Sequence, residues 1–438
     1  MSNDNDNNKD FIDMRDQASK EAIPPEQQAP TPAPAGSGGP PKKSGKIPGW
    51  AIALIFLGIG LAVGLSNFNF NFGFGGIRNL AIGQQTNNSE LTTLTTLAAS
   101  QVNHIDVHLG VDNINVETHN SNYIRIVYNP PRTGNYNIPL YNFNEITGEL
   151  RIFTEPNLVI IGHVRTGSGL DIYLPEDIDL QNFSLRTSTG NIDISRQNIE
   201  SNLADNVSLN STTGRIGARH IFAGSFSATS TTGRIELNNI ETSNNFFASS
   251  TTGRIEGRNI TAGSNMTVSA TTGRIDLGNI HAYGNGDFRS TTGGIVLSSN
   301  GDFNNVTINA STGRIDVSDF SANSMDIRST TGNIDVRQVS LASDFRASAS
   351  TGRIDAIGIE ANVLGFTTTT GNISLNNSRA ISNAGFQAST GRVNVGNTEI
   401  NGILAIHTTT GNINLTGVDT DMDRANIITN RNANISIN

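Results

Sequence analysis

The chain has 438 residues, a formal net charge of −9 and no cysteine; only 15% of its residues are charged, and 45 are glycine. The lack of cysteine excludes disulfides, thiolate metal sites and a thiol nucleophile within this chain. The acidic balance disfavours nucleic acid as a partner because phosphate binding needs a basic surface. Abundant Gly, Ser, Thr and Asn favour β structure with tight turns over helices.

The first part of the chain predicts a tail followed by a membrane anchor. Residues 1–47 are polar and rich in proline, so we expect a disordered tail. Residues 48–66 are uncharged and apolar, and they are long enough to cross a bilayer as one helix in contact with membrane lipid. Lysines precede this run, so the positive-inside rule places the tail in the cytoplasm and the rest of the chain outside. Gly60 and Gly64 form a GxxxG motif that can pair two such helices.

A repeat dominates the rest of the chain. Residues 67–99 are expected to be an extracytoplasmic linker. The tripeptide Thr-Thr-Gly or Ser-Thr-Gly then recurs twelve times at intervals of 24, 19 or 20 residues. A sustained period of this length is the signature of a solenoid. We call the glycine of each tripeptide the repeat glycine; these are Gly190, Gly214, Gly233, Gly253, Gly273, Gly293, Gly313, Gly332, Gly352, Gly371, Gly391 and Gly411.

Within each copy the apolar residues alternate with polar ones, which predicts strands. Ile or Val stands two residues after every repeat glycine, an apolar residue five before it, and Ser, Thr or Ala three before it. These side chains are expected to point inward and to stack in columns, with a left-handed glycine at a narrow corner. The prediction is an all-β, single-stranded parallel β-solenoid over residues 100–438, with regular repeats over 183–438 and more irregular coils of the same kind before them.

The repeat also carries a family resemblance. The segment LDIYLPEDIDLQNFSLRTSTGNIDI and the units TTGRIELNNI and STGRIDV resemble the DUF4097 family of bacterial envelope proteins, which carries an adhesin label. The resemblance covers about residues 100–438 and implies a membrane-anchored envelope domain. Some family members are linked to envelope stress responses. The family brings no catalytic residues, and no cofactor is expected.

Two sets of side chains are candidate binding sites. Outward-facing arginines follow the repeat glycine in seven coils and would form a ladder suited to polyanionic wall or surface glycopolymers. A neighbouring acidic column, as in Glu236 and Glu256, can instead neutralise this ladder, and both interpretations stay open. His104, Asp106 and His108 share one strand face and are weak candidates for metal ligands, or simply exposed polar groups. The arginines are Arg215, Arg234, Arg254, Arg274, Arg314, Arg353 and Arg392.

Three classes of function are compatible with this organisation. The sequence favours a single-pass membrane protein whose solenoid is a non-catalytic adhesin, or a structural and binding module of the cell envelope. Self-association through the GxxxG motif or the solenoid ends would fit the same role. An envelope-stress sensor that signals through the tail is the first alternative. The second is a polysaccharide-acting β-helix enzyme, whose site would need the irregular residues 120–182 because the regular coils lack long loops.

Overall fold

The computed structural model describes residues 91–131, 138–154, 168–197, 201–299, 301–429 and 435–437. All of these residues belong to one compact unit, which lies within Gly75–Asn438. The expected tail, 1–47, and span, 48–66, lie outside the described residues. Among the residues that are described, no helix is long and apolar enough to cross a bilayer. The last part of the expected linker forms a strand, β1 (Thr92–Ala98).

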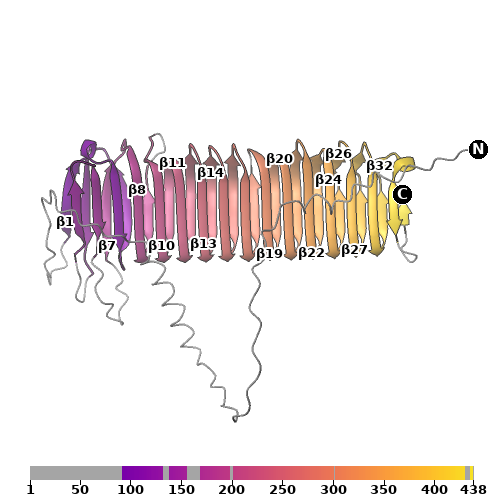
Figure 1. Ribbon diagram of the computed structural model, residues 1–438, viewed down its shortest axis with the longest axis horizontal. Coiled ribbons are helices and arrows are strands. Elements are labelled where there is room, and N and C mark those ends of the chain that lie inside the picture. Colours follow the sequence, from indigo (N-terminus) through magenta and orange to yellow (C-terminus); the bar gives the residue numbers. More distant parts are fainter. Residues whose placement is uncertain are drawn as a thin grey trace, which may run out of the picture. The chain divides into compact units, whose positions relative to one another are not determined.

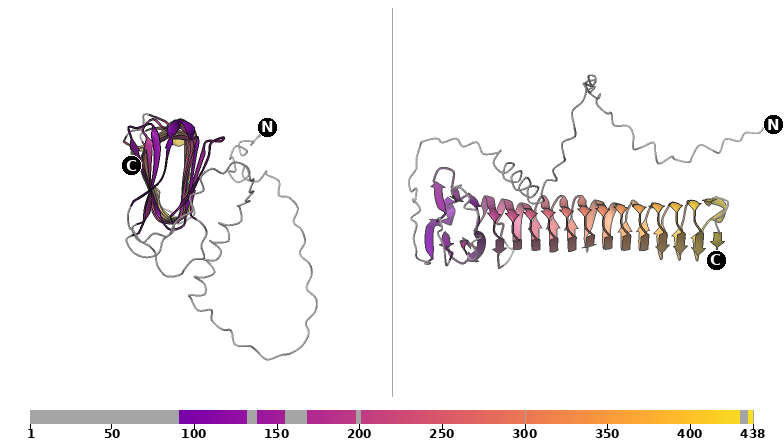
Figure 2. Two further views of the ribbon diagram at one scale, coloured as in Figure 1. Left: turned by 90° about the vertical axis from the view of Figure 1, so that its left-hand side faces the viewer. Right: turned by 90° about the horizontal axis from the view of Figure 1, so that it is seen from below.

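The described residues form an all-β solenoid (Figure 1), as predicted. Each regular coil contributes one strand to each of two parallel walls, which close into a narrow ring in the end-on view of Figure 2. The first wall, before the repeat glycines, contains β8 (Leu180–Thr189), β10 (Ala204–Thr213), β13 (Phe246–Thr252), β15 (Met266–Thr272), β17 (Gly286–Thr292), β19 (Asp302–Thr312), β22 (Asp344–Thr351), β24 (Val363–Thr370), β27 (Ala384–Thr390), β30 (Leu404–Thr410) and β33 (Asn426–Thr429).

The second wall follows the repeat glycines. It contains β9 (Ile192–Ser195), β12 (Ile235–Thr242), β14 (Ile255–Ala262), β16 (Ile275–Ala282), β18 (Ile295–Ser299), β21 (Ile334–Leu341), β23 (Ile354–Ala361), β25 (Ile373–Asn376), β28 (Val393–Gly396), β31 (Ile413–Thr416) and β34 (Ile435–Ile437). Two long strands run from the second wall of one coil into the first wall of the next and so belong to both walls: β11 (Ile216–Thr232) and β20 (Ile315–Thr331). Short pieces complete the later coils: β26 (Arg379–Ala380), β29 (Glu399–Ile400), β32 (Asp419–Thr420) and the 3-10 helix η2 (Met422–Arg424).

Successive coils stack in register. Ile235 pairs with Ile255, and Ile255 pairs with Ile275. Ser249 pairs with Ser269 on the first wall in the same way. Each residue therefore lies beside its counterpart one coil away, as the spacing of the repeat glycines predicts, at the strand separation of about 4.8 Å that is usual in sheets.

The residues before the regular repeats are arranged differently from the irregular coils that we expected. β2 (His104–Leu109) lies between β8 and β6 (Glu149–Phe153), and β3 (Asn113–His119) lies between β9 and β7 (Gly169–Pro175). The coil formed by β2 and β3 is thus inserted between the first regular coil and a coil that comes later in the chain. Antiparallel strands pair with the coil of β6 and β7. β4 (Tyr123–Asn129) lies between β7 and β1, and β5 (Leu140–Asn144) pairs with β6. A short 3-10 helix, η1 (Ala99–Gln101), follows β1.

The interior contains the predicted columns of apolar side chains. The residue two after each repeat glycine is at most 1% exposed, and the residue five before it at most 2%. Rings stack along the axis, as in Phe226 on Phe246, whose centroids are 5.6 Å apart. Seven residues before the repeat glycine most coils carry a large side chain, but one coil has Gly286 there. The ring of Phe303 fills the space, since a Cβ at Gly286 would lie 3.0 Å from it. The core is therefore continuous over the coils.

Close stacking explains why the corner requires glycine. A Cβ at Gly253 would collide with the carbonyl oxygen of Gly233 one coil earlier. The φ of Gly253 is +156°, a region open essentially only to glycine, rather than the left-handed helical value that we expected. The small residue three before it, Ser250, donates a hydrogen bond to the Gly233 carbonyl at 3.3 Å. Left-handed residues instead lie six positions after the repeat glycines, with φ between 46° and 58°: His220, Asn239, Asn259, Asn279, Asp319, Gln338, Asn377 and Asn397.

Candidate functional site

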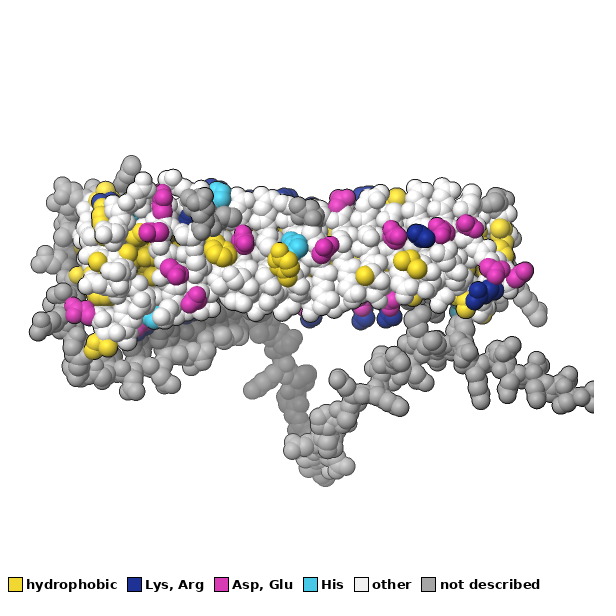
Figure 3. All heavy atoms as spheres, turned by 90° about the horizontal axis from the view of Figure 1, so that it is seen from above, with side chains coloured by type: hydrophobic (Ala, Val, Ile, Leu, Met, Phe, Trp, Pro, Cys, Tyr) yellow, Lys and Arg dark blue, Asp and Glu magenta, His cyan; other side chains and the backbone are white. Residues whose placement is uncertain are grey.

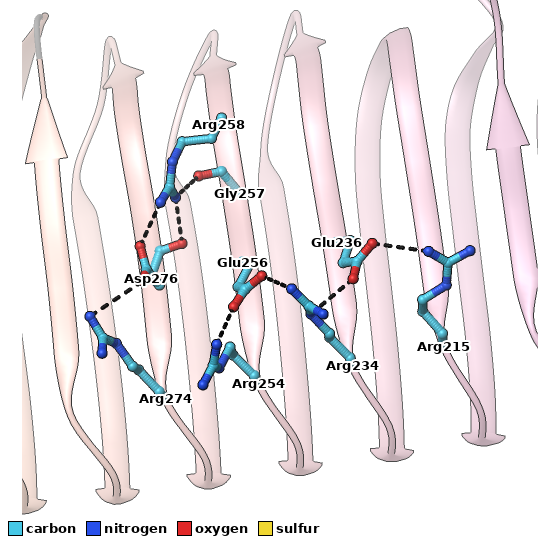
Figure 4. Close-up of polar contacts among 9 residues, drawn as sticks. All are labelled: Arg215, Arg234, Glu236, Arg254, Glu256, Gly257, Arg258, Arg274 and Asp276. Carbon is cyan, nitrogen blue, oxygen red and sulfur yellow. Dashed lines mark hydrogen bonds and ion pairs between the residues drawn. The ribbon is translucent and has the colours of Figure 1, made fainter.

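The predicted arginine ladder lies on the outside of the solenoid, and carboxylates run beside it (Figure 4). Arg215 binds Glu236 at 3.0 Å and Asp193 at 2.5 Å. Arg234 lies between Glu236, at 2.9 Å, and Glu256. Each of these guanidinium groups therefore bridges two carboxylates from different coils, because residues one coil apart are close enough to share an ion pair.

The same network continues along the coils with interruptions. Arg314 lies 2.7 Å from Asp316 and 2.8 Å from Asp335. Arg353 reaches the same Asp335, at 3.3 Å, whose side chain is only 4% exposed. Within the described residues, Arg392 has no carboxylate at ion-pair distance, since an asparagine occupies the acidic position of its coil. Gly294, Asn333 and Asn372 replace arginine elsewhere in the column, so the ladder is not continuous.

Four further ion pairs lie along the ladder. Arg254 lies 2.6 Å from Glu256. Arg274 and Arg258 both bind Asp276, at 3.3 Å and 2.9 Å respectively. Arg353 also binds Asp355 at 2.6 Å. Every arginine of the predicted ladder except Arg392 is thus paired with at least one carboxylate.

The electrostatics of the network are those of mutual neutralisation. Partial burial alone would raise the pKa of Glu256, but hydrogen bonds from Arg254 and Arg234 hold it below its ordinary value. The pKa of Asp355 is raised by burial and by neighbouring Asp335, against the opposing effect of Arg353. Exposed ion pairs of this kind contribute little stability each. The column offers hydrogen-bond donors already engaged with carboxylates, and not a free strip of positive charge.

The candidate metal residues lie on one face of β2, as predicted. His104, Asp106 and His108 are partly exposed and alternate with buried Ile105 and Val107. His104 Nδ1 lies 2.9 Å from the Asn182 amide, and Asp106 is 3.6 Å from Arg151. Desolvation and the nearby Arg186 lower the pKa of His108. Among the residues that the structure describes, no group of three or more His, Asp or Glu side chains is placed to hold a metal ion.

Asparagine columns are a feature that the sequence analysis missed. Six positions after the repeat glycine, the Asn259 amide donates to Asn239 Oδ1 at 2.7 Å, and the Asn239 amide lies 2.9 Å from His220 Nε2. Twelve positions after it, Asn245 Oδ1 accepts a hydrogen bond from the Asn265 side-chain amide at 3.3 Å, and Asn265 Oδ1 accepts one from the backbone N–H of Asn285 at 3.0 Å. The recurrence of Asn at these two spacings was visible in the sequence. The reason for asparagine six positions after the repeat glycine is the left-handed backbone there, which the alternation of apolar and polar residues does not reveal.

Hydroxyl side chains cover much of the remaining surface. Thr stands directly before every repeat glycine, and Thr or Ser one position earlier; nearly all of these residues are exposed. On the face drawn in Figure 3, uncharged polar side chains and backbone predominate, and charged side chains are scattered along the solenoid. The repeated outer surface is therefore a lattice of hydrogen-bonding groups in which most of the charges are paired.

The comparisons with known proteins agree with this architecture. Residues 102–304 match the model of the family described as Toastrack DUF4097. The match begins beside β2, and the same in-register repeat continues beyond it as far as Gly411. Searches of curated proteins and of solved structures found no match. The matched part of this chain therefore belongs to the Toastrack DUF4097 family.

Proposed function

We propose that the chain is a non-catalytic binding module of the cell envelope. Residues 48–66 anchor it in the membrane, the tail lies in the cytoplasm, and the solenoid presents its outer columns to surface polymers or partner surfaces. The stacking of equivalent coils carries the proposal, because it repeats the same hydrogen-bonding groups along the outer surface. A scaffold of this kind suits the recognition of extended ligands more than the enclosure of a small one.

The short corners of the regular coils support a role without catalysis. Only three residues separate β12, which ends at Thr242, from β13, which begins at Phe246. Enzymes built on such scaffolds use long loops to bring acids and bases together over a cleft. The regular coils devote nearly all of their residues to the walls, and most of their acidic side chains form ion pairs with arginine.

A topology and binding experiment tests the proposal. An epitope after residue 429 and another near residue 5 are probed with protease on intact spheroplasts, and the purified full chain is incubated with isolated envelope polymers. We expect digestion of the solenoid epitope alone, together with retention of envelope material that is released unchanged. Protection of the solenoid epitope, or cleavage of the bound polymer, would contradict the proposal.

A further inference from the structure

The first wall carries a shallow groove that runs across five coils. Its volume is about 500 Å³, and it crosses β15, β17, β19, β20 and β22. The groove follows the outward columns four and two residues before the repeat glycines. The first of these columns reads Ser269, Arg289, Asn309, Arg328 and Ser348 along the axis.

The order of side chains in this groove is symmetrical about Asn309. An arginine stands one coil away on each side of it, and a serine stands two coils away. Equivalent positions in the two coils before the groove are Thr229 and Ser249, and in the two coils after it Thr367 and Gln387. Because outward positions do not pack in the core, the fold itself does not require two arginines here.

Each groove arginine is held in place by an aspartate on its own strand. Arg289 Nε lies 2.7 Å from Asp287 Oδ1, and Arg328 Nη2 lies 2.7 Å from Asp326 Oδ2. The two arginine side chains nevertheless stay 63% and 68% exposed. The pairing leaves the groove close to neutral while keeping guanidinium donors and carboxylate acceptors side by side at its edge.

The chemistry of these groups matches hydroxylated ligands. A sugar hydroxyl both donates and accepts a hydrogen bond, and the groove offers both: guanidinium groups that donate, carboxylates that accept, and hydroxyl and amide groups that do both. A polyanion would meet arginines that are already neutralised, on a chain with a net charge of −9. The lining residues include no aromatic or large apolar side chain, so an apolar ligand would find little to bind.

We infer that the groove centred on Asn309 binds an extended neutral polysaccharide, which lies along the solenoid axis and receives hydrogen bonds from Arg289 and Arg328. The inference rests on the proposed function, since it names the site and the ligand class of the binding module. The two arginines are two coils apart, about 10 Å at the usual strand spacing. A chain of sugar rings would therefore contact both of them with successive residues.

The test measures retention of the purified full chain, kept in detergent, on immobilised polysaccharides. Dextran and mannan are the neutral probes, and alginate and hyaluronate are the polyanionic ones. The double variant Arg289→Ala with Arg328→Ala removes both donors, and Asn309→Phe fills the groove from an outward position. Arg219→Ala with Arg337→Ala is the matched control, because it removes two exposed positive charges from the second wall.

We expect binding of at least one neutral probe, an affinity at least tenfold lower in both groove variants, and less than a twofold change in the control. Failure of wild type to bind either neutral probe, or groove variants that bind as wild type does, would overturn the inference. Envelope polymers that still bind both groove variants would leave the proposed function standing and remove this site. A wild-type chain that binds neither envelope polymers nor any of the four polysaccharides would overturn both.

Discussion

Gly391→Ala probes the close approach of successive coils at the repeat-glycine corner. The added Cβ would collide with the Gly371 carbonyl, and the φ of +145° is unfavourable for alanine. The φ alone costs about 2 kcal/mol. Relief of the collision would stretch two hydrogen bonds of 2.9 Å, from Gly391 N–H to the Thr410 carbonyl and from Gly371 N–H to the Thr390 carbonyl, each worth about 1 kcal/mol. We expect a local destabilisation of about 4 kcal/mol.

Hydrogen exchange measured by mass spectrometry is the suitable assay, because a solenoid can open in a few coils without unfolding globally. Amides of β27 and β28 should exchange about a thousandfold faster in Gly391→Ala. Gly385→Ala is the matched control in the same coil: its nearest atom would be the Leu364 carbonyl oxygen, at 4.0 Å. The control should change local stability by less than about 1 kcal/mol. Equal effects of the two variants would refute the close-approach argument.

Three further perturbations test the columns. Asn259, at φ 57°, should tolerate Asn259→Gly, as Gly358 and Gly417 occupy the same column, whereas Asn259→Ala should lose about 1–2 kcal/mol in chemical denaturation; equal losses would contradict a left-handed requirement. The folded pKa of Glu256 lies below its ordinary 4.5, so its ionised form stabilises the fold above that pH, and this contribution disappears as pH falls through the folded value. Glu256→Gln should therefore flatten the loss of thermal stability below about pH 4.5, and an unchanged slope would count against the network. Phe226→Ala, in the buried ring stack, should cost about 3–5 kcal/mol, read from thermal unfolding, and a cost below 1 kcal/mol would mean that the rings do not pack as described.

The sequence predicted those features that follow from a strict period. The spacing of Gly233, Gly253 and Gly273 gives the length of a coil, and Ile at two residues after each glycine gives the inward face. Parity alone also placed Arg254 outside and Glu256 beside it. These inferences need only the two-residue period of a strand and the stacking of equal coils.

Other features depend on three-dimensional contacts that no period encodes. β2 and β6 carry no Thr-Thr-Gly tripeptide, so nothing in the sequence indicated that an early coil would be stacked between two coils that come later in the chain. The φ of the repeat glycines is set by the carbonyl of the preceding coil rather than by the local sequence. The groove around Asn309 is formed by outward side chains on five coils. Outward side chains do not pack in the core, so their sequence shows no periodic pattern from which the groove could be predicted.

In-register stacking is the central claim, and the absence of cysteine from the chain allows a direct test by crosslinking. Ser249 and Ser269 are paired on adjacent coils, and their Oγ atoms are 3.0 Å apart. The usual strand separation of about 4.8 Å lies within the range of Cα–Cα distances that a disulfide spans. The double variant Ser249→Cys with Ser269→Cys should form an intramolecular disulfide on mild oxidation, detected by mass spectrometry after proteolysis. Ser249→Cys with Asn309→Cys, three coils apart, should stay reduced. A disulfide in the distant pair, or none in the adjacent pair, would contradict the solenoid register.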